Sequence, residues 1–254
     1  MIDRNRAAYE TRHAVDVYRR ARDLQPAEAA ILDRFRAELS TARMLDLGVG
    51  GGRTTWHFAP LVRSYVGADY SAPLIEDCGP RFQQMSNVEL RVCDARDMSA
   101  FADAAFDFIL FSYNGLDYVD GDGRRRALAE IRRVLRPGGR FVFSSHNLQF
   151  APELYTVHFS WSPLQLFFAM RRAIRVRRHN PPLTEIERGD EAILYDGGLD
   201  FSLATWYGRP AVQVRQLLAL GFNGVDVYGF DGQLVPHAEL PRNKDPWLYY
   251  VCFG

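Results

Sequence analysis

The sequence predicts a single domain of the α/β class, on three observations. The chain has 254 residues, a length that suits one such domain with an insertion or a small lid. The stretch from Met44 to Thr55 has the pattern of a short buried strand, a glycine turn and the start of a helix. A second strand over 65–69 ends on Asp69, at roughly the distance from Asp46 at which βαβ folds place an acidic residue.

The glycine turn has the form D-x-G-x-G-x-G, in which Asp46 precedes Gly48, Gly50 and Gly52. Glycines allow positive φ and close approach of a ligand, and the following helix presents free N–H groups there. The dinucleotide pattern G-x-G-x-x-G fails because its third glycine would fall on Arg53, and no phosphate-binding G-x-x-x-x-G-K-[ST] occurs. The alternative is a turn that only packs strand against helix.

This turn resembles the first motif of the class I S-adenosylmethionine-dependent methyltransferases. The run E-I-x-R-V-L-R-P-G-G-x-F, from Glu130 to Phe141, is similar to the family's late motif and lies at the expected distance from Asp46. The resemblance covers residues 43–145 and about 209–254. It implies S-adenosyl-L-methionine as cofactor and a seven-stranded, mostly parallel sheet in the order 3-2-1-4-5-7-6. The last strand would be antiparallel, with helices on both faces.

Hydrophobic periodicity and turn signals place the remaining elements. Helices are expected over 7–24 and 27–39, the second after the start signal Gln25-Pro26. Further strands are expected at 88–92, 105–111, 140–145, 225–228 and 247–252. Further helices are expected to start near residues 53, 71, 122 and 163, and one more spans 210–220.

The resemblance places the cofactor contacts on the turns that follow the strands. A carboxylate at Asp69 accepts hydrogen bonds from both ribose hydroxyls, with a helix N-cap as the alternative. The turn at Asp94 and Ala95 resembles the family's adenine-contacting segment. The full set implied for the cofactor is Asp46, Gly48, Gly50, Gly52, Asp69, Tyr70, Asp94, Ala95, Ser112 and Tyr113.

Candidates for the chemistry follow the fourth and fifth strands, where α/β sheets bind ligands. Tyr113 is the aromatic candidate for favouring a positive sulfonium. His146 is the candidate general base because imidazole titrates near neutral pH, although it would equally suit binding of the acceptor or closing of a turn. The candidate acceptor-binding residues are Tyr18, Asn114, His146 and Trp206. The [ND]-P-P-[YF] tetrad of many nucleobase and protein-amide methylases is absent after the fourth strand.

Two segments lie outside the shared core. Residues 1–42 are predicted as helices that cover the cofactor, with Tyr9, His13 and Tyr18 lining the site or, alternatively, packed or solvated. Residues 148–208 are predicted as an inserted lid or cap, rich in aromatic residues and with five arginines between 171 and 178. Three interpretations stay open for this insertion: a lid over the acceptor, a surface that docks a membrane or an acidic partner, or an ordinary cap with solvated arginines.

Composition narrows the function. Lys+Arg and Asp+Glu both number 31, and this balance disfavours nucleic acid and favours a small-molecule acceptor. The polar start has no apolar signal region, and no apolar run reaches membrane-spanning length, so a cytoplasmic protein without membrane insertion is expected. Three widely spaced cysteines and the absence of a ligand cluster predict no metal site. A homodimer is possible.

These observations lead to one main hypothesis: S-adenosylmethionine-dependent methyl transfer to an oxygen or nitrogen of a small organic acceptor, such as a natural product or a sugar. The transfer would be an in-line displacement, for which the protein must align acceptor and methyl group. The first alternative is a non-catalytic protein that binds the cofactor or S-adenosylhomocysteine. The second is a methyltransferase that acts on a macromolecule or a carrier-bound substrate.

Overall fold

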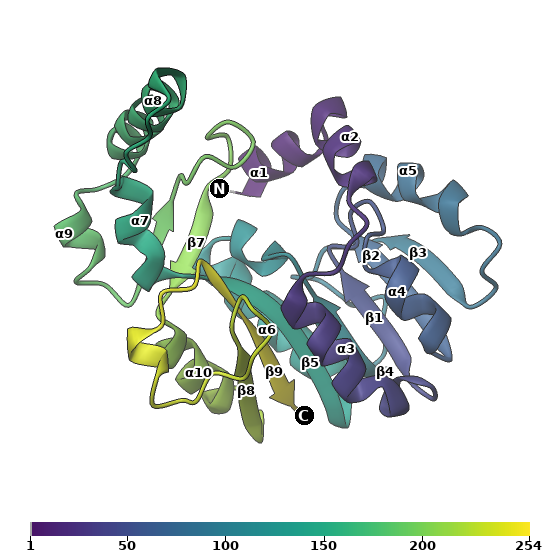
Figure 1. The fold of residues 1–254 in the computed structure, drawn as a ribbon. Helices are drawn as coiled ribbons and strands as arrows, with labels where there is room; N and C mark the ends of the chain where they lie inside the picture. The colour runs from purple at the N-terminus through teal and green to yellow at the C-terminus, as the bar shows by residue number, and fades with distance from the viewer. Residues whose placement is uncertain (1) are drawn as a thin grey trace.

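The computed structural model describes the backbone of residues 2–254 and the side chains from Arg4 on, so Met1 of the expected covering segment 1–42 lies outside the described residues. A twisted sheet forms the centre of the molecule, with helices packed on both of its faces (Figure 1). Its strands are β1 (Arg43–Leu47), β2 (Ser64–Asp69), β3 (Val88–Val92), β4 (Phe106–Phe111), β5 (Leu135–Asn147), β6 (Glu191–Leu194), β7 (Thr205–Gly208), β8 (Gly224–Tyr228) and β9 (Trp247–Phe253).

The helices precede, connect and follow the strands of the sheet. They are α1 (Ile2–Tyr9), α2 (Arg12–Arg20), α3 (Pro26–Leu39), α4 (Thr55–Phe58), α5 (Ala72–Phe82), α6 (Gly121–Val134), α7 (Ala151–Tyr155), α8 (Pro163–His179), α9 (Leu183–Ile186) and α10 (Pro210–Ala219). The predicted start of α3 is confirmed: Pro26 is its first residue, and the Glu28 carboxylate accepts a hydrogen bond from the backbone N–H of Gln25.

The predicted sheet topology is confirmed. The five strands from β1 to β5 pair in parallel in the order β3-β2-β1-β4-β5. The expected sixth and seventh strands are β8 and β9. β9 pairs antiparallel with β5, in a register that places Phe141 opposite Cys252, and β8 pairs antiparallel with β9. The carboxyl ends of β1, β2 and β4 therefore meet at one edge of the sheet, where ligands of such folds bind.

The fifth strand is longer than predicted, and the sheet contains an extra hairpin. β5 begins at Leu135 and continues to Asn147, beyond the range 140–145. At its end it pairs in parallel with β7, which pairs antiparallel with β6. Both strands of this hairpin lie inside the insertion and were not predicted, because four-residue strands give too little alternation to stand out among scattered aromatic residues.

The sheet separates two layers of core. Successive residues of a strand point to opposite faces, so Met44 packs with α3 on one side while Leu45 packs with α6 on the other. The insertion has a third, smaller core of its own, which includes Tyr155, Phe201 and Tyr207. Part of its aromatic content therefore stabilises the insertion itself.

The helix expected over 7–24 is wrong in its bounds, because two helices, α1 and α2, occupy this part of the chain. The chain turns at Glu10 and Thr11, and the Thr11 hydroxyl accepts a hydrogen bond from the backbone N–H of Ala14 at 3.2 Å. A threonine that caps a new helix competes with helix continuation, and the apolar periodicity did not reveal this break. None of the helices in the described part of the chain combines the length and the apolar character needed to cross a membrane.

Candidate cofactor and active site

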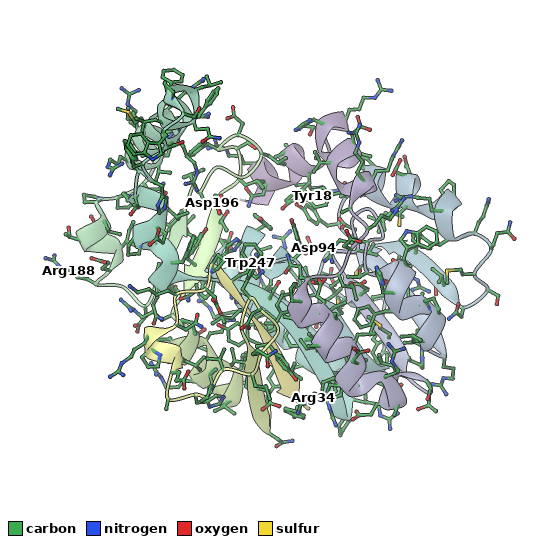
Figure 2. The ribbon with its side chains drawn as sticks, in the orientation of Figure 1. Tyr18, Arg34, Asp94, Arg188, Asp196 and Trp247 are labelled. Carbon is green, nitrogen blue, oxygen red and sulfur yellow. The ribbon has the colours of Figure 1, made fainter. Side chains whose placement is uncertain are left out.

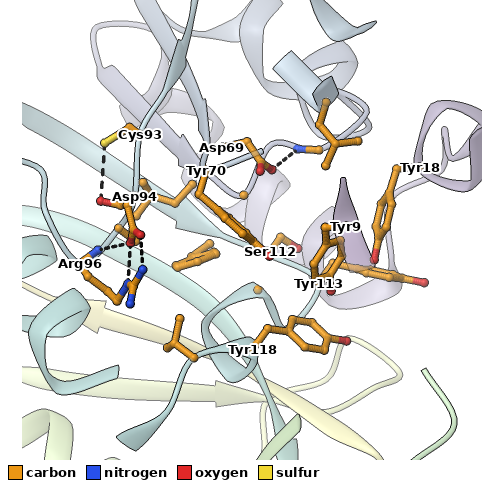
Figure 3. A pocket seen from close by; sticks show the side chains of 18 residues that line it. Tyr9, Tyr18, Asp69, Tyr70, Cys93, Asp94, Arg96, Ser112, Tyr113 and Tyr118 are labelled. Atoms are coloured by element: carbon orange, nitrogen blue, oxygen red, sulfur yellow. Dashed lines mark hydrogen bonds and ion pairs between the residues drawn. The ribbon is translucent and has the colours of Figure 1, made fainter. Parts of the chain in front are cut away.

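A cavity opens at the edge of the sheet where β1, β2, β3 and β4 end. It encloses about 820 Å³ of empty space, part of it open to solvent. Its lining residues come from the turns after these strands and from the N-terminal helices: Tyr9, Tyr18, Leu47, Gly48, Gly50, Asp69, Tyr70, Leu74, Cys93, Asp94, Ala95, Arg96, Phe111, Ser112, Tyr113, Gly115, Tyr118 and Val119. Figure 3 shows their side chains around the hollow, and Figure 2 places Tyr18 and Asp94 on the side of the molecule away from Arg34.

Asp69 lies at the carboxyl end of β2 and is buried. Each of its carboxylate oxygens accepts one backbone N–H, from Gly50 at 3.0 Å and from Ser71 at 2.9 Å. Burial raises its pKa to about 6 despite these two hydrogen bonds. A carboxylate oxygen accepts more than one hydrogen bond, so both oxygens keep capacity for hydroxyl donors in the cavity.

The glycine turn divides into a lining part and a supporting part. Gly48 and Gly50 have positive φ and line the cavity. Gly52 does not line it: a Cβ there would lie 2.4 Å from the ring of Phe82, so glycine serves the packing of the turn against α5. Asp46 lies below the turn, where its carboxylate accepts hydrogen bonds from the hydroxyls of two buried residues, Thr54 and Tyr65, at 2.5 Å each.

The placement of Asp46 and Gly52 corrects two expected cofactor contacts. Burial raises the pKa of Asp46 to about 6, although its two hydroxyl partners favour the ionised form. Both residues act on the cavity indirectly, because they hold the turn that carries Gly48 and Gly50. The sequence motif identifies the turn without distinguishing residues that face the ligand from residues that support it.

The turn after β3 brings Asp94, Ala95 and Arg96 to the cavity wall. Asp94 is held by Arg96, whose Nε and Nη2 donate to the two carboxylate oxygens at 2.9 and 2.5 Å (Figure 3). Partial burial alone would raise the pKa of Asp94, but the bonds from Arg96 lower it below its ordinary value. Arg96 therefore both lines the cavity and forms an ion pair with Asp94.

Four tyrosines form an aromatic cluster over the cavity. Tyr9 of α1 has ring centroid distances of 5.6 Å to Tyr18, 6.1 Å to Tyr70 and 5.4 Å to Tyr118. Tyr9 is buried and Tyr18 is half-buried, and both line the cavity, so Tyr9 is not the solvated residue that the alternative expected. His13, the third candidate from this segment, is exposed and is not among the lining residues.

The turn after β4 places Ser112 and Tyr113 against the cavity. Tyr113 and Asn114 both have positive φ, at 54° and 60°, a conformation that is uncommon for residues with side chains. The Asn114 N–H donates to Ser144 Oγ at 2.7 Å, and this bond holds the turn in place. Tyr113 is half exposed, and the Arg53 guanidinium lies 5.2 Å from its ring centroid. Strained residues held by such contacts are frequent at binding sites.

A buried ion pair below the cavity was missed by the sequence analysis. Glu28 of α3 accepts hydrogen bonds from Arg53 at 2.5 and 2.6 Å, and also from the hydroxyls of Ser112 and Tyr249. Burial opposes ionisation of Glu28, but its bonds with Arg53 and Ser112 lower its pKa below the ordinary value. This ion pair connects helix α3 to the residue that follows the glycine turn. No local signal marks it, because the partners are far apart in sequence.

His146 is buried at the end of β5 and pairs with a buried carboxylate. Its Nδ1 lies 2.8 Å from Asp117 Oδ2, which also accepts the His146 backbone N–H at 2.7 Å. An ionised carboxylate only accepts, so Nδ1 carries the hydrogen and Nε2 keeps its lone pair. The Asn114 amide nitrogen lies 3.3 Å from Nε2, and Asn114 Oδ1 is buried without a hydrogen-bond partner among the described residues.

Asp117 is the second residue that sequence reasoning missed. Its other oxygen accepts hydrogen bonds from Arg124 at 2.6 Å and from the Ser145 hydroxyl at 2.7 Å. Burial lowers the pKa of Arg124, against the effect of its ion pair with Asp117. The carboxylate is thus compensated by a cation and fixed in orientation, so it holds the His146 ring in one position.

Trp206, an expected acceptor-binding residue, lies outside the cofactor cavity, as do Asn114 and His146. The Arg124 guanidinium lies 3.9 Å from the centre of the Trp206 ring, and the indole N–H donates to Glu191 at 3.3 Å. It is buried in β7 by these contacts and does not line the cavity. All the lining residues lie between positions 9 and 119, so the insertion contributes none of them. An aromatic residue in a predicted lid is as suited to packing as to binding, and the sequence does not separate the two.

Comparisons with known proteins agree with this geometry. Residues 44–139 match a family described as "Methyltransferase domain". The chain is 33% identical over 113 residues to an uncharacterized methyltransferase, YcgJ, of Bacillus subtilis. The aligned segment covers 44% of this chain and 42% of that protein. It is 35% identical over 105 residues to the ubiquinone/menaquinone biosynthesis C-methyltransferase UbiE of Desulfotalea psychrophila, over 39% of each chain.

Among solved structures, the crystal structure of Burkholderia thailandensis 1,6-didemethyltoxoflavin-N1-methyltransferase with bound 1,6-didemethyltoxoflavin and S-adenosylhomocysteine has a TM-score of 0.63. The two sequences are 19% identical, and the superposition covers 99% of this chain and 87% of that chain. This similarity is one of fold. The sheet order, the cavity and the matched segment 44–139 are similar to those of the class I S-adenosylmethionine-dependent methyltransferases. The chain spans about two fifths of the length of the curated relatives it matches.

The residues that line the cavity suit S-adenosylmethionine as the cofactor. The cavity combines an acidic side chain at the end of β2, a close backbone approach at Gly50, and apolar and aromatic walls for a flat base. A Cβ at Gly50 would lie 3.6 Å from the ring of Tyr18, within the space between the turn and the covering helix. These groups match the ribose, chain and base of an adenosyl ligand in kind.

Proposed function

We propose that this chain transfers a methyl group from S-adenosylmethionine to an oxygen or nitrogen of a small organic acceptor. The observation that carries the proposal is the convergence of Asp69, Gly50, Asp94 and Tyr113 on one cavity at the carboxyl edge of the sheet. Asp69 would hold the ribose hydroxyls, Asp94 and Ala95 the base, and Ser112 and Tyr113 the methionine part. Gly48 and Gly50 would let the backbone approach the ligand.

The bound cofactor supplies a methyl group that is already activated on a positively charged sulfur. The protein must therefore align an acceptor with it and exclude water. We assign the covering role to α1 and α2, because Tyr9 and Tyr18 close the cavity above the strand ends. Tyr113 presents a half-exposed ring to the same space, and its face would favour a cation.

His146 is the proposed general base. Its Nε2 would take the proton of an acceptor hydroxyl or protonated amine, while Asp117 accepts from Nδ1 and compensates the positive charge that forms on the ring. Asn114 Oδ1 would accept a hydrogen bond from the acceptor, because this buried oxygen otherwise has no donor in the described structure. Tyr118 lines the cofactor cavity, and its ring centroid lies 6.4 Å from that of His146, so this tyrosine lies next to both the cavity and the base.

A second candidate is methylation at carbon. The relative from Desulfotalea psychrophila, 35% identical over 105 residues, is named a C-methyltransferase. Such a reaction also uses a base when the attacking carbon must lose a proton, so the His146–Asp117 pair is compatible with either acceptor atom.

The test is methyl transfer with methyl-labelled S-adenosylmethionine across a panel of phenols, sugars, amines and enolisable ketones, read by mass spectrometry. A product labelled at oxygen or nitrogen supports the proposal, and a product labelled at carbon supports the second candidate. Either product excludes a binding protein without catalysis. The variant Asp117→Asn would then lose roughly 10²-fold or more in kcat, because the ring loses its orienting carboxylate. It should keep its affinity for S-adenosylhomocysteine. Full kcat in this variant would remove His146 from the role of base.

A further inference from the structure

The most exposed apolar surface of the chain lies on the insertion. Of the 16 large hydrophobic side chains that are exposed in the described structure, eight lie within residues 157–174. They are Val157, Phe159, Trp161, Leu164, Phe167, Phe168, Met170 and Ile174. Trp161 is 92% exposed and Phe159 is 69% exposed, the two highest values of that set. We call these eight residues the apolar tip. So large a group of exposed apolar side chains indicates an interaction surface.

Helix α8 carries five residues of the apolar tip, and the other three, Val157, Phe159 and Trp161, precede the helix. Ala173 and Val176 are the buried residues of α8, and they face α7 and the core of the insertion. On the opposite face, the spacing of Phe167, Ile174 and Leu164 aligns them along one stripe of the helix. In Figure 1 α8 stands at an outer corner of the molecule, on the same edge of the sheet as α1 and α2.

The same exposed face becomes cationic toward the C-terminal end of α8. Arg171 and Arg178 continue the stripe, and both are exposed. The segment from Phe159 to Asn180 holds five arginines and no acidic residue, although the whole chain has no net charge. Arg175 is engaged by Asp200, and Arg177 donates to the Tyr155 carbonyl, so Arg171 and Arg178 are the arginines best placed for an external anion.

We propose that the apolar tip and Arg171 and Arg178 form a docking surface for an anionic lipid bilayer. An amphipathic surface with tryptophan and phenylalanine at one end and arginines beside them places the rings at the acyl boundary and the guanidinium groups among the lipid phosphates. Charge complementarity favours this occupant, since all the charges on the segment have one sign. The docking is peripheral, and it is independent of the reaction proposed above.

Vesicle sedimentation tests the proposal. The full chain is mixed with vesicles of phosphatidylcholine alone or of equal parts phosphatidylcholine and phosphatidylglycerol, at low and high salt. We expect binding to the anionic vesicles, weakened by salt and absent on phosphatidylcholine alone. The paired variant Phe167→Ser/Phe168→Ser should weaken binding at least tenfold, because two rings leave the acyl boundary. The variant Arg171→Gln/Arg178→Gln should weaken it roughly 25-fold, at about fivefold for each arginine.

Two controls keep the result specific. Leu218→Ser and Leu234→Ser remove exposed apolar side chains elsewhere and should bind vesicles as the wild type does. All variants should keep the wild-type affinity for S-adenosylhomocysteine, which shows that they are folded and separates this test from that of the proposed function.

Fluorescence gives a direct view of the tip. Anionic vesicles should shift the tryptophan emission of the wild type to the blue, and the variant Trp161→Phe should lose this shift. Equal binding to both vesicle types, unchanged binding in both paired variants, or no binding at all would overturn the proposal. Sedimentation of the chain without lipid as a dimer that the Phe167→Ser/Phe168→Ser variant abolishes, together with absent vesicle binding, would identify a second copy as the occupant and would also overturn it.

Discussion

The pH dependence of cofactor binding follows from the position of Asp69. Burial raises the pKa of its carboxyl to about 6 in the unliganded protein, so the neutral form dominates below that pH. Ribose hydroxyls donate to the ionised form, and the ligand therefore selects the carboxylate. The affinity for the cofactor is therefore highest above the pKa of Asp69 and falls as the pH drops through that value.

The size of the effect follows from the ionised fraction. With a pKa of about 6, roughly nine tenths of Asp69 is ionised at pH 7 and roughly one tenth at pH 5. Apparent affinity scales with the competent fraction, so the Kd for S-adenosylhomocysteine should rise about tenfold between pH 7 and pH 5. Isothermal titration at several pH values measures it, and below the pKa binding should also release close to one proton.

Two variants isolate the group responsible. Asp69→Asn should bind more weakly at pH 7 and should show a flat profile over this range. Asp46 titrates in the same range but does not face the cavity, so Asp46→Asn should keep the slope. A wild-type profile that is flat between pH 7 and pH 5, or a slope that survives in Asp69→Asn, would refute this reasoning.

Two further predictions concern the support below the cavity. Glu28→Gln leaves the buried guanidinium of Arg53 without its carboxylate and should lower the free energy of unfolding by about 3–5 kcal/mol in urea titrations; a loss under 1 kcal/mol would contradict a buried ion pair. Gly51→Ala should cost about 1–3 kcal/mol, because its Cβ would lie 2.2 Å from the Tyr18 carbonyl oxygen. Gly121→Ala, at the start of α6, places a Cβ no nearer than 3.6 Å to the Arg125 guanidinium and should be neutral or stabilising in the same assay.

The sheet was predictable because its signals are local. The turn from Asp46 to Gly52 and the run from Glu130 to Phe141 each combine a strand boundary with a required turn, and both depend on neighbouring residues alone. The break at Thr11 was not predictable from periodicity, because a side-chain hydrogen bond decides it. The strands of the insertion were missed because they are short and depend on pairing with the far end of β5.

The site was predictable where strand ends define it. Asp69 and Asp94 follow strands of a recognisable order, so their meeting at one edge follows from topology. Glu28, Asp117 and the packing of Trp206 on Arg124 were out of reach, since each depends on a partner distant in sequence or on which side of a strand faces the core.

Isothermal titration of S-adenosylhomocysteine into the wild type and Asp69→Ala at pH 7, with NADH as control ligand, tests the central claim most directly. We expect micromolar affinity for the wild type, no binding of NADH, and a loss of more than roughly 30-fold in Asp69→Ala, which removes two charge-assisted hydrogen bonds. A folded Asp69→Ala variant that binds with the wild-type affinity, or a folded wild type that binds NADH in place of S-adenosylhomocysteine, would contradict the assignment of this cavity.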